Sequence, residues 1–127
     1  MINNIAISLL SLKKKQDLSK FCKILKSENV KFVELPITKI FDSYEFKRKK
    51  ISKFKNILEK NSIEVSSIQA LFYGLEHLNI FDKKYEKKIL IHLKKIIKIA
   101  KYLGAKNLIF GSPKNRLLKG KNKRKQK

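Results

Sequence analysis

A short polar segment near the C-terminal end of the chain carries the side chains best suited to bind an anion or a sugar. Residues 107–116 read NLIFGSPKNR, so an apolar run stops at Gly111 and is followed by Ser112, Lys114, Asn115 and Arg116. Arginine offers a planar fork of donors that suits phosphate or carboxylate, and asparagine can both donate to and accept from a hydroxyl group. The segment predicts a ligand-binding loop; the alternative is a solvated turn in which Ser-Pro only redirects the chain.

Other polar side chains follow or interrupt apolar runs. Glu34 and Gln69 could each hold a sugar hydroxyl or help a metal site, but a charge in an apolar strand costs free energy unless it is paired, so Glu34 could equally pair with a lysine. His77, beside Glu76, is a weak candidate metal ligand, because a metal site needs three or four converging groups. His92 lies beside the apolar stripe of a predicted helix, and we expect it to be structural.

The elements that must position these side chains alternate along the chain. Mostly apolar runs at residues 5–10, 31–36, 63–69 and 108–110 predict strands, and Gly104 predicts a helix C-terminus just before the last of them. The intervening stretches place apolar residues three and four apart, as amphipathic helices do. The apolar residues of the three predicted helices are, in chain order, Leu18, Phe21, Cys22 and Leu25; Ile51, Phe54, Ile57 and Leu58; and Ile89, Leu93, Ile96, Ile97, Ala100 and Leu103.

Strands that alternate with helices predict an α/β fold with a parallel sheet. Because right-handed crossovers join neighbouring parallel strands, the C-terminal ends of all the strands meet at one edge, and ligands bind at that edge. We therefore expect Glu34, Gln69 and residues 111–116 to lie along one edge of the sheet.

Three stretches resemble the sugar phosphate isomerase/epimerase family of xylose-isomerase-like TIM barrels, which also includes the endonuclease-IV-type enzymes. They are VKFVELP, SSIQALFYGLEHLNIFD and IAKYLGAKNLIFGSPKNR. The resemblance implies a partial (β/α)8 barrel of about four strands and three helices, in which residues 1–118 form the N-terminal half. It also implies a sugar or sugar phosphate as ligand. The substrate-binding residues are then Glu34, Gln69, Ser112, Lys114, Asn115 and Arg116.

The same resemblance implies an ancestral reaction, a metal-assisted proton transfer next to the carbonyl of a keto-sugar or sugar phosphate. The family binds its divalent metal mainly through residues of the second half of the barrel. We therefore expect this chain to be inactive alone and to bind no metal tightly. A half-barrel leaves sheet edges uncovered, so self-association or a complementing second half-barrel is expected.

The charge of the chain has two explanations. A formal net charge of +22 suggests a phosphate-rich partner, and a nucleic-acid-binding protein related to the endonuclease-IV branch is the alternative function. Only three of the 32 basic residues are arginine, however, and Lys, Ile and Asn all have A/T-rich codons, so compositional drift of the genome accounts for much of the lysine. We favour drift over nucleic-acid binding.

Residues 119–127 contain six basic residues and are predicted to form a disordered tail. This tail either attracts nucleic acid without sequence preference or reflects a shifted reading frame in an A-rich gene.

Cysteine content and hydropathy bear on the compartment. The single Cys22 cannot form an internal disulfide, which is typical of a reducing compartment and of a buried, structural thiol. At the N-terminus an apolar stretch precedes the positive charges, the reverse of a signal peptide, and no apolar run is long enough to span a membrane. The sequence predicts a cytoplasmic protein without a membrane partner.

Overall fold

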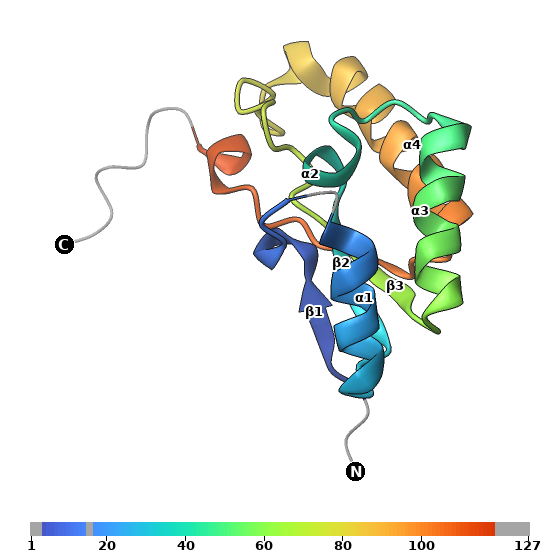
Figure 1. Cartoon of the computed structure of the whole chain (residues 1–127). Helices are drawn as coiled ribbons and strands as arrows, with labels where there is room; N and C mark the ends of the chain where they lie inside the picture. Colours follow the sequence, from blue (N-terminus) through green and yellow to red (C-terminus); the bar gives the residue numbers. More distant parts are fainter. Residues whose placement is uncertain (1–3, 15–16, 119–127) are drawn as a thin grey trace, which may run out of the picture.

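The computed structural model, which describes residues 4–14 and 17–118, is a mixed α/β fold built on one parallel sheet (Figure 1). Its four strands are β1 (Ala6–Ser8), β2 (Phe32–Pro36), β3 (Glu64–Gln69) and β4 (Asn107–Leu108), and they lie side by side in chain order. Every neighbouring pair is parallel. The predicted α/β class and parallel sheet are thus confirmed, whereas the predicted tail at residues 119–127 lies outside the described part.

Within residues 4–14 and 17–118, four α-helices and three short 3₁₀ helices connect or follow the strands. The α-helices are α1 (Leu18–Ser27), α2 (Ile37–Phe41), α3 (Arg48–Lys60) and α4 (Glu86–Leu103). The 3₁₀ helices are η1 (Leu9–Ser11), η3 (Lys83–Tyr85) and η4 (Pro113–Arg116). Among the described residues, no helix combines the length and the apolar character that a membrane crossing needs.

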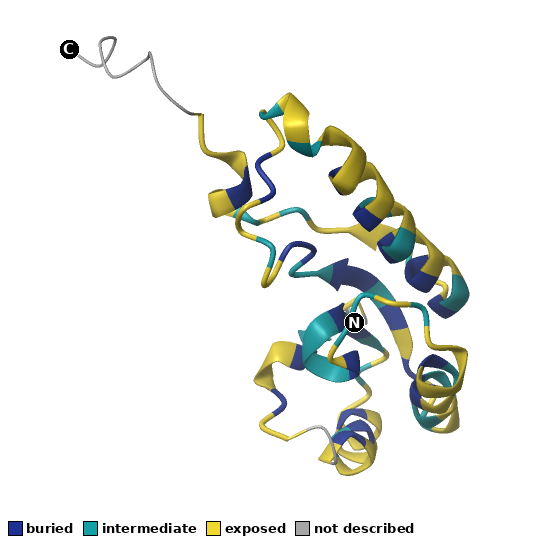
Figure 2. Cartoon of the chain, turned by 90° about the horizontal axis from the view of Figure 1, so that it is seen from above, coloured by how far each residue is buried: buried dark blue, intermediate teal, exposed yellow. Residues whose placement is uncertain are grey.

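The long helices lie on one side of the sheet. Because each strand pairs with the next one in the chain and parallel crossovers are right-handed, each connecting helix falls on the same face. Figure 2 shows α1, α3 and α4 along one side of the strands, with their buried residues turned toward the sheet. Helix α3 contacts both α1 and α4, so the helices form one layer.

The hydrophobic core fills the space between this layer and the sheet. The strands contribute fully buried apolar side chains, and the helices cover them with their own, as the amphipathic pattern predicts. The completely buried members include Val33, Leu35 and Ile68 from the strands and Cys22, Ile37, Ile51, Ile96 and Ile99 from the α-helices. The face of each strand that is turned toward the helices is therefore the apolar one.

The opposite face of the sheet is polar near the C-terminal ends of the strands. Register places Ser8 beside Glu34 and Glu34 beside Ser67, after an irregularity at Ser66. The Ser67 hydroxyl donates to Glu34 Oε1 at 3.2 Å, and Gln69 Nε2 donates to the Ser8 hydroxyl. The polar residues that interrupt the strands therefore pair with one another across strands.

Three element predictions need correction. Strand β4 comprises Asn107–Leu108 and not residues 108–110. Strand β1 is shorter than predicted because the Ser8 hydroxyl accepts from the backbone N–H of Leu10 and starts a 3₁₀ turn. The apolar face of α4 is rotated relative to the prediction: Ile97 is 51% exposed, whereas His92 and Ile99 are buried. The short helix α2 was not predicted, since five residues carry too little periodicity to be recognised.

Candidate ligand-binding site

The loops that follow β3 and β4 form a pocket at the C-terminal edge of the sheet. The pocket has a volume of about 350 Å³. The loop after β3 supplies Ala70, Phe72, Tyr73 and Glu76, and the loop after β4 supplies Ser112, Pro113, Lys114 and Asn115. Three of the predicted residues, Ser112, Lys114 and Asn115, thus lie at the expected edge of the sheet.

Side chains from two other parts of the chain hold the loop after β3 by its carbonyl groups. The Tyr44 hydroxyl lies 3.0 Å from both Ala70 O and Tyr73 O. The His92 Nε2–H donates to Leu71 O at 2.6 Å, with the ring packed edge-on against Tyr44. Because these donors come from the α2–α3 connection and from α4, the shape of the pocket depends on contacts between distant parts of the chain.

Asn115 holds the same loop from the other side. Its side chain is 1% exposed, and its Nδ2 donates to Leu75 O at 2.8 Å and to Leu78 O at 2.9 Å. Its backbone carbonyl also accepts from Ile80 N at 3.0 Å. We predicted Asn115 as a ligand-binding residue, but both of its amide hydrogens are used within the protein. It positions the pocket wall.

The exposed side chains of the pocket combine a cation, a carboxylate and an aromatic ring. Glu76 Oε1 accepts from the backbone N–H of Gly74 at 3.3 Å. The pKa of the Glu76 carboxyl is lowered, mainly by hydrogen bonds from its own backbone N–H and from Gly74, with smaller contributions from Lys114 and His77. Tyr73 is 69% exposed, and Lys114 is also exposed. An ionised carboxylate accepts hydroxyl hydrogen bonds, while a nearby ammonium attracts an anion.

Arg116 does not line this pocket. Its Nη2 donates to Gly111 O at 3.0 Å, and its guanidinium lies 5.8 Å from the centre of the Phe110 ring. The side chain thus folds back over the end of β4. The structure assigns it to closing the loop, which differs from the predicted contact with substrate.

Glu34 and Gln69 lie apart from the pocket, on the polar face of the sheet. The partner of Glu34 is the Ser67 hydroxyl and not a lysine, so the lysine-pairing alternative is wrong, whereas the contact of Glu34 with a sugar or metal stays a prediction. Gln69 contacts Ser8 in the same way. The predicted substrate-binding residues therefore do not form one site: Glu34 and Gln69 lie on this face, Ser112, Lys114 and Asn115 line the loop pocket, and Arg116 does neither.

The described residues do not fit a divalent metal. Within residues 4–14 and 17–118, no three side chains of His, Cys, Asp or Glu gather into a metal-binding group. His77 lines a neighbouring pocket of about 470 Å³, and its ring lies 6.1 Å from that of Tyr85. We accordingly assign no metal step to this chain.

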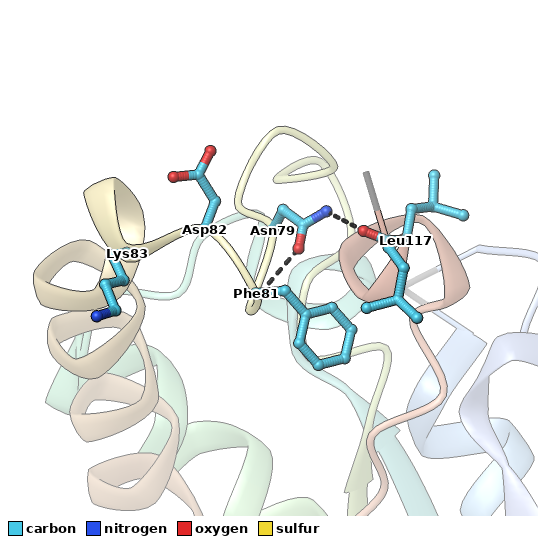
Figure 3. Close-up of a pocket in the computed structure, with 6 residues that line it drawn as sticks. Asn79, Phe81, Asp82, Lys83 and Leu117 are labelled. Atoms are coloured by element: carbon cyan, nitrogen blue, oxygen red, sulfur yellow. Dashed lines mark hydrogen bonds between the residues drawn. The ribbon is translucent and has the colours of Figure 1, made fainter. Parts of the chain in front are cut away.

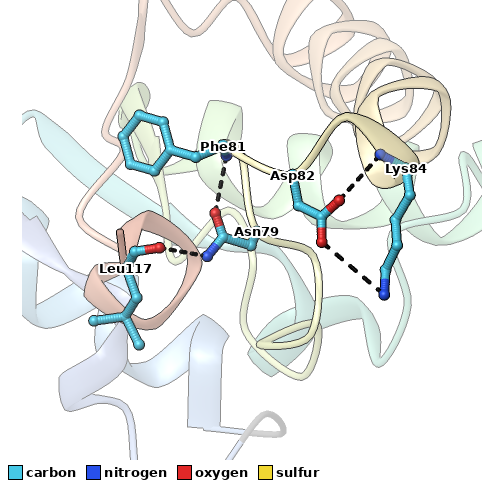
Figure 4. Close-up of polar contacts among 5 residues, drawn as sticks. All are labelled: Asn79, Phe81, Asp82, Lys84 and Leu117. Carbon is cyan, nitrogen blue, oxygen red and sulfur yellow. Dashed lines mark hydrogen bonds and ion pairs between the residues drawn. The ribbon is translucent and has the colours of Figure 1, made fainter. Parts of the chain in front are cut away.

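A further hollow of about 390 Å³ lies where residues 79–83 meet the chain after η4 (Figure 3). Phe81 and Leu117 line it, and Asn79 joins the two segments because its Nδ2 donates to Leu117 O at 2.6 Å. The Asn79 Oδ1 accepts from Phe81 N, in the same segment, at 2.9 Å. Asp82 accepts from Lys84 N and pairs with the Lys84 ammonium (Figure 4). The polar groups of this hollow thus serve local structure.

Comparisons of the chain with protein-family models, with curated proteins and with solved structures found no match. The family resemblance therefore stays a prediction. Sequence reasoning missed the role of Tyr44. It predicted the structural role of His92 but not the contact of this side chain with the loop leaving β3. The only signal for His92 was a polar residue between the apolar positions of an amphipathic helix.

Proposed function

We propose that this chain binds a sugar phosphate in the pocket between the loops that follow β3 and β4. Lys114 pairs with the phosphate, Ser112 and Glu76 bind hydroxyl groups, and the carbon skeleton packs on Tyr73. The observation that carries the proposal is that these four side chains, from two neighbouring strand ends, line one pocket. Their chemistry matches a ligand that is anionic at one end and hydroxylated along its length.

The proposal includes the fold. We infer that the sheet is the N-terminal half of a (β/α)8 barrel of the sugar phosphate isomerase/epimerase type. The support is its topology: parallel strands in consecutive order with the long helices on one face, which is the arrangement of strands and helices around such a barrel. The pocket lies at the C-terminal edge, where barrels of this kind bind ligands. The proton transfer of the family is not assigned to residues of this chain.

Calorimetric titration of the 127-residue chain with fructose 6-phosphate tests the ligand. A charge-assisted hydrogen bond contributes about 1.5–3 kcal/mol, so we expect Lys114→Gln to weaken binding by roughly tenfold to a hundredfold. The matched control is Lys106→Gln, which removes the same charge from an exposed position just before β4. This control should leave the affinity within about twofold.

Two further ligands separate the parts of the proposal. Inorganic phosphate should bind more weakly than fructose 6-phosphate, because it lacks the hydroxyl groups and carbon skeleton. A short single-stranded oligonucleotide tests the nucleic-acid alternative, whose affinity falls steeply with salt. If Lys114→Gln and Lys106→Gln lower every affinity equally, the chain is a non-specific polyanion binder and the sugar phosphate proposal is wrong.

A further inference from the structure

Both edges of the sheet lack a neighbouring strand among the described residues. Strand β1 pairs only with β2, and β4 pairs only with β3. Ile109 N donates to Ile68 O, so residues 107 and 109 direct their backbone groups toward β3, and Leu108 directs its own outward. An open edge with unpaired N–H and C=O groups is a template for pairing with another strand.

The flank of the molecule beside β4 carries exposed apolar side chains. Leu108 and Ile109 are exposed on the edge strand and the residue after it, and Leu90 and Ile97 are exposed on α4. The contacts between α4 and α3 lie on a different side of α4, where Tyr102 packs edge-on against Phe46 and lies under the Lys55 ammonium at 5.1 Å. Leu90 and Ile97 are about 120–140° around the helix from Tyr102. They form an apolar stripe on the side away from α3.

The flank beside β1 also carries exposed apolar side chains. Ile5 lies exposed just before β1, and Ile24 lies exposed on α1. Helix α1 follows β1 and belongs to the same layer as α3 and α4. Each end of the sheet thus presents an open parallel edge with exposed apolar side chains on the strand segment and on the adjoining helix.

We propose that these two flanks bind each other in a second copy of this chain, with β4 of each copy pairing in parallel with β1 of the other. A partner strand that continues the parallel sheet runs in the same direction as β4 and is followed by a helix on the same face of the sheet, and β1 with α1 meets both conditions. A two-fold axis along the strands generates two identical junctions. Two sheets of four strands then give eight, the number at which a parallel sheet with outer helices closes.

The positive charge of the two copies opposes this association, so the effect of salt on the dimer tests the proposal. Each chain carries a formal net charge of +22, so two copies repel each other at low ionic strength. Raising NaCl from about 0.1 M to 1 M shortens the Debye length from about 10 Å to 3 Å. The dimer should therefore become tighter with added salt, the opposite of polyanion binding.

Sedimentation velocity of the full chain tests the proposal. We expect a species of about 30 kDa, twice the 14.9 kDa chain, at protein concentrations near 100 μM. Ile97→Glu places a charge in the contact and should weaken the dimer by at least about tenfold. The matched control is Ile91→Glu, because Ile91 lies on the same helix, is 48% exposed against 51% for Ile97, and undergoes the same change in charge.

Three results would overturn the proposal. They are a wild-type chain that stays monomeric in high salt, an open series of ever larger species, and equal effects of Ile97→Glu and Ile91→Glu. If a variant fails to fold, hydrogen exchange of the wild-type chain decides: the amides of residues 5–8 and 107–109 must exchange more slowly at about 100 μM than at about 1 μM. The inference rests on the sheet and not on the sugar ligand, so failure of either proposal leaves the other standing.

Discussion

Asn115 offers the sharpest test of how the candidate pocket is built. Replacing it by alanine removes the donors to Leu75 O and Leu78 O, which lie 2.8 and 2.9 Å from Nδ2. Each hydrogen bond contributes about 1 kcal/mol, and a buried carbonyl left without a donor costs about 1–3 kcal/mol. We therefore expect Asn115→Ala to lower the free energy of unfolding by about 2–4 kcal/mol, a large part of the 5–15 kcal/mol typical of a domain.

Urea unfolding followed by circular dichroism measures this loss. The slope of free energy against urea should stay unchanged, because the same surface is exposed on unfolding. Asn56→Ala is the control: Asn56 is exposed on α3, and its replacement should change stability by no more than about 0.5 kcal/mol. If Asn115→Ala is as mild as this control, the amide does not hold the loop and the reasoning is wrong.

Asn115→Asp separates hydrogen bonding from side-chain volume. Aspartate has nearly the same shape, but an ionised carboxylate presents only acceptors to the carbonyls of Leu75 and Leu78. We expect this variant to be at least as unstable as Asn115→Ala at neutral pH. Because burial raises the pKa of a carboxyl group, and its protonated form can donate one hydrogen bond, acidification should recover part of the loss. A pH-independent deficit would contradict this explanation.

Two other predictions follow from buried titratable groups. The pKa of His92 is lowered, mainly by burial and less by Lys95, although the bond to Leu71 O opposes the shift. The unfolded chain therefore binds more protons, so the free energy of unfolding should fall as the pH drops below the ordinary histidine value of 6.5, and His92→Gln should flatten this dependence in urea titrations. Burial also raises the pKa of the Cys22 thiol to about 11. We expect Cys22 to react with a thiol reagent only as fast as the chain unfolds, so rapid labelling of the native protein would show that the helix layer opens.

The main elements of the fold could be predicted from sequence because their signals are local. Helices α1, α3 and α4 follow apolar spacing, and Gly104 ends α4 with a backbone φ of 74°, which glycine adopts without a steric penalty. Pro36 stands at the end of β2, as expected for a residue without a backbone N–H. Periodicity of this kind also implies the parallel sheet, since alternating strands and helices can pack in few ways.

For the candidate site, the sequence predicted where along the chain it lies but not the role of each residue. Ser112 and Lys114 lie at the expected strand end and line a pocket. Their neighbour Asn115, of an equally suitable type, is buried because loops about 40 residues apart meet there. A residue type states which hydrogen bonds a side chain can make, but tertiary packing decides whether a carbonyl of the protein already accepts them.

By itself, then, the sequence determined the order of strands and helices, the common edge of the strand ends and the chemistry available there, because these depend on residues near one another in the chain. Only the tertiary structure decided that Glu34 pairs with Ser67, that Gln69 reaches Ser8 across 61 residues, and that α4 turns Ile97 outward. Each of these outcomes depends on how separate elements pack, and the free energy of that packing is a property of the assembled layers rather than of any one segment.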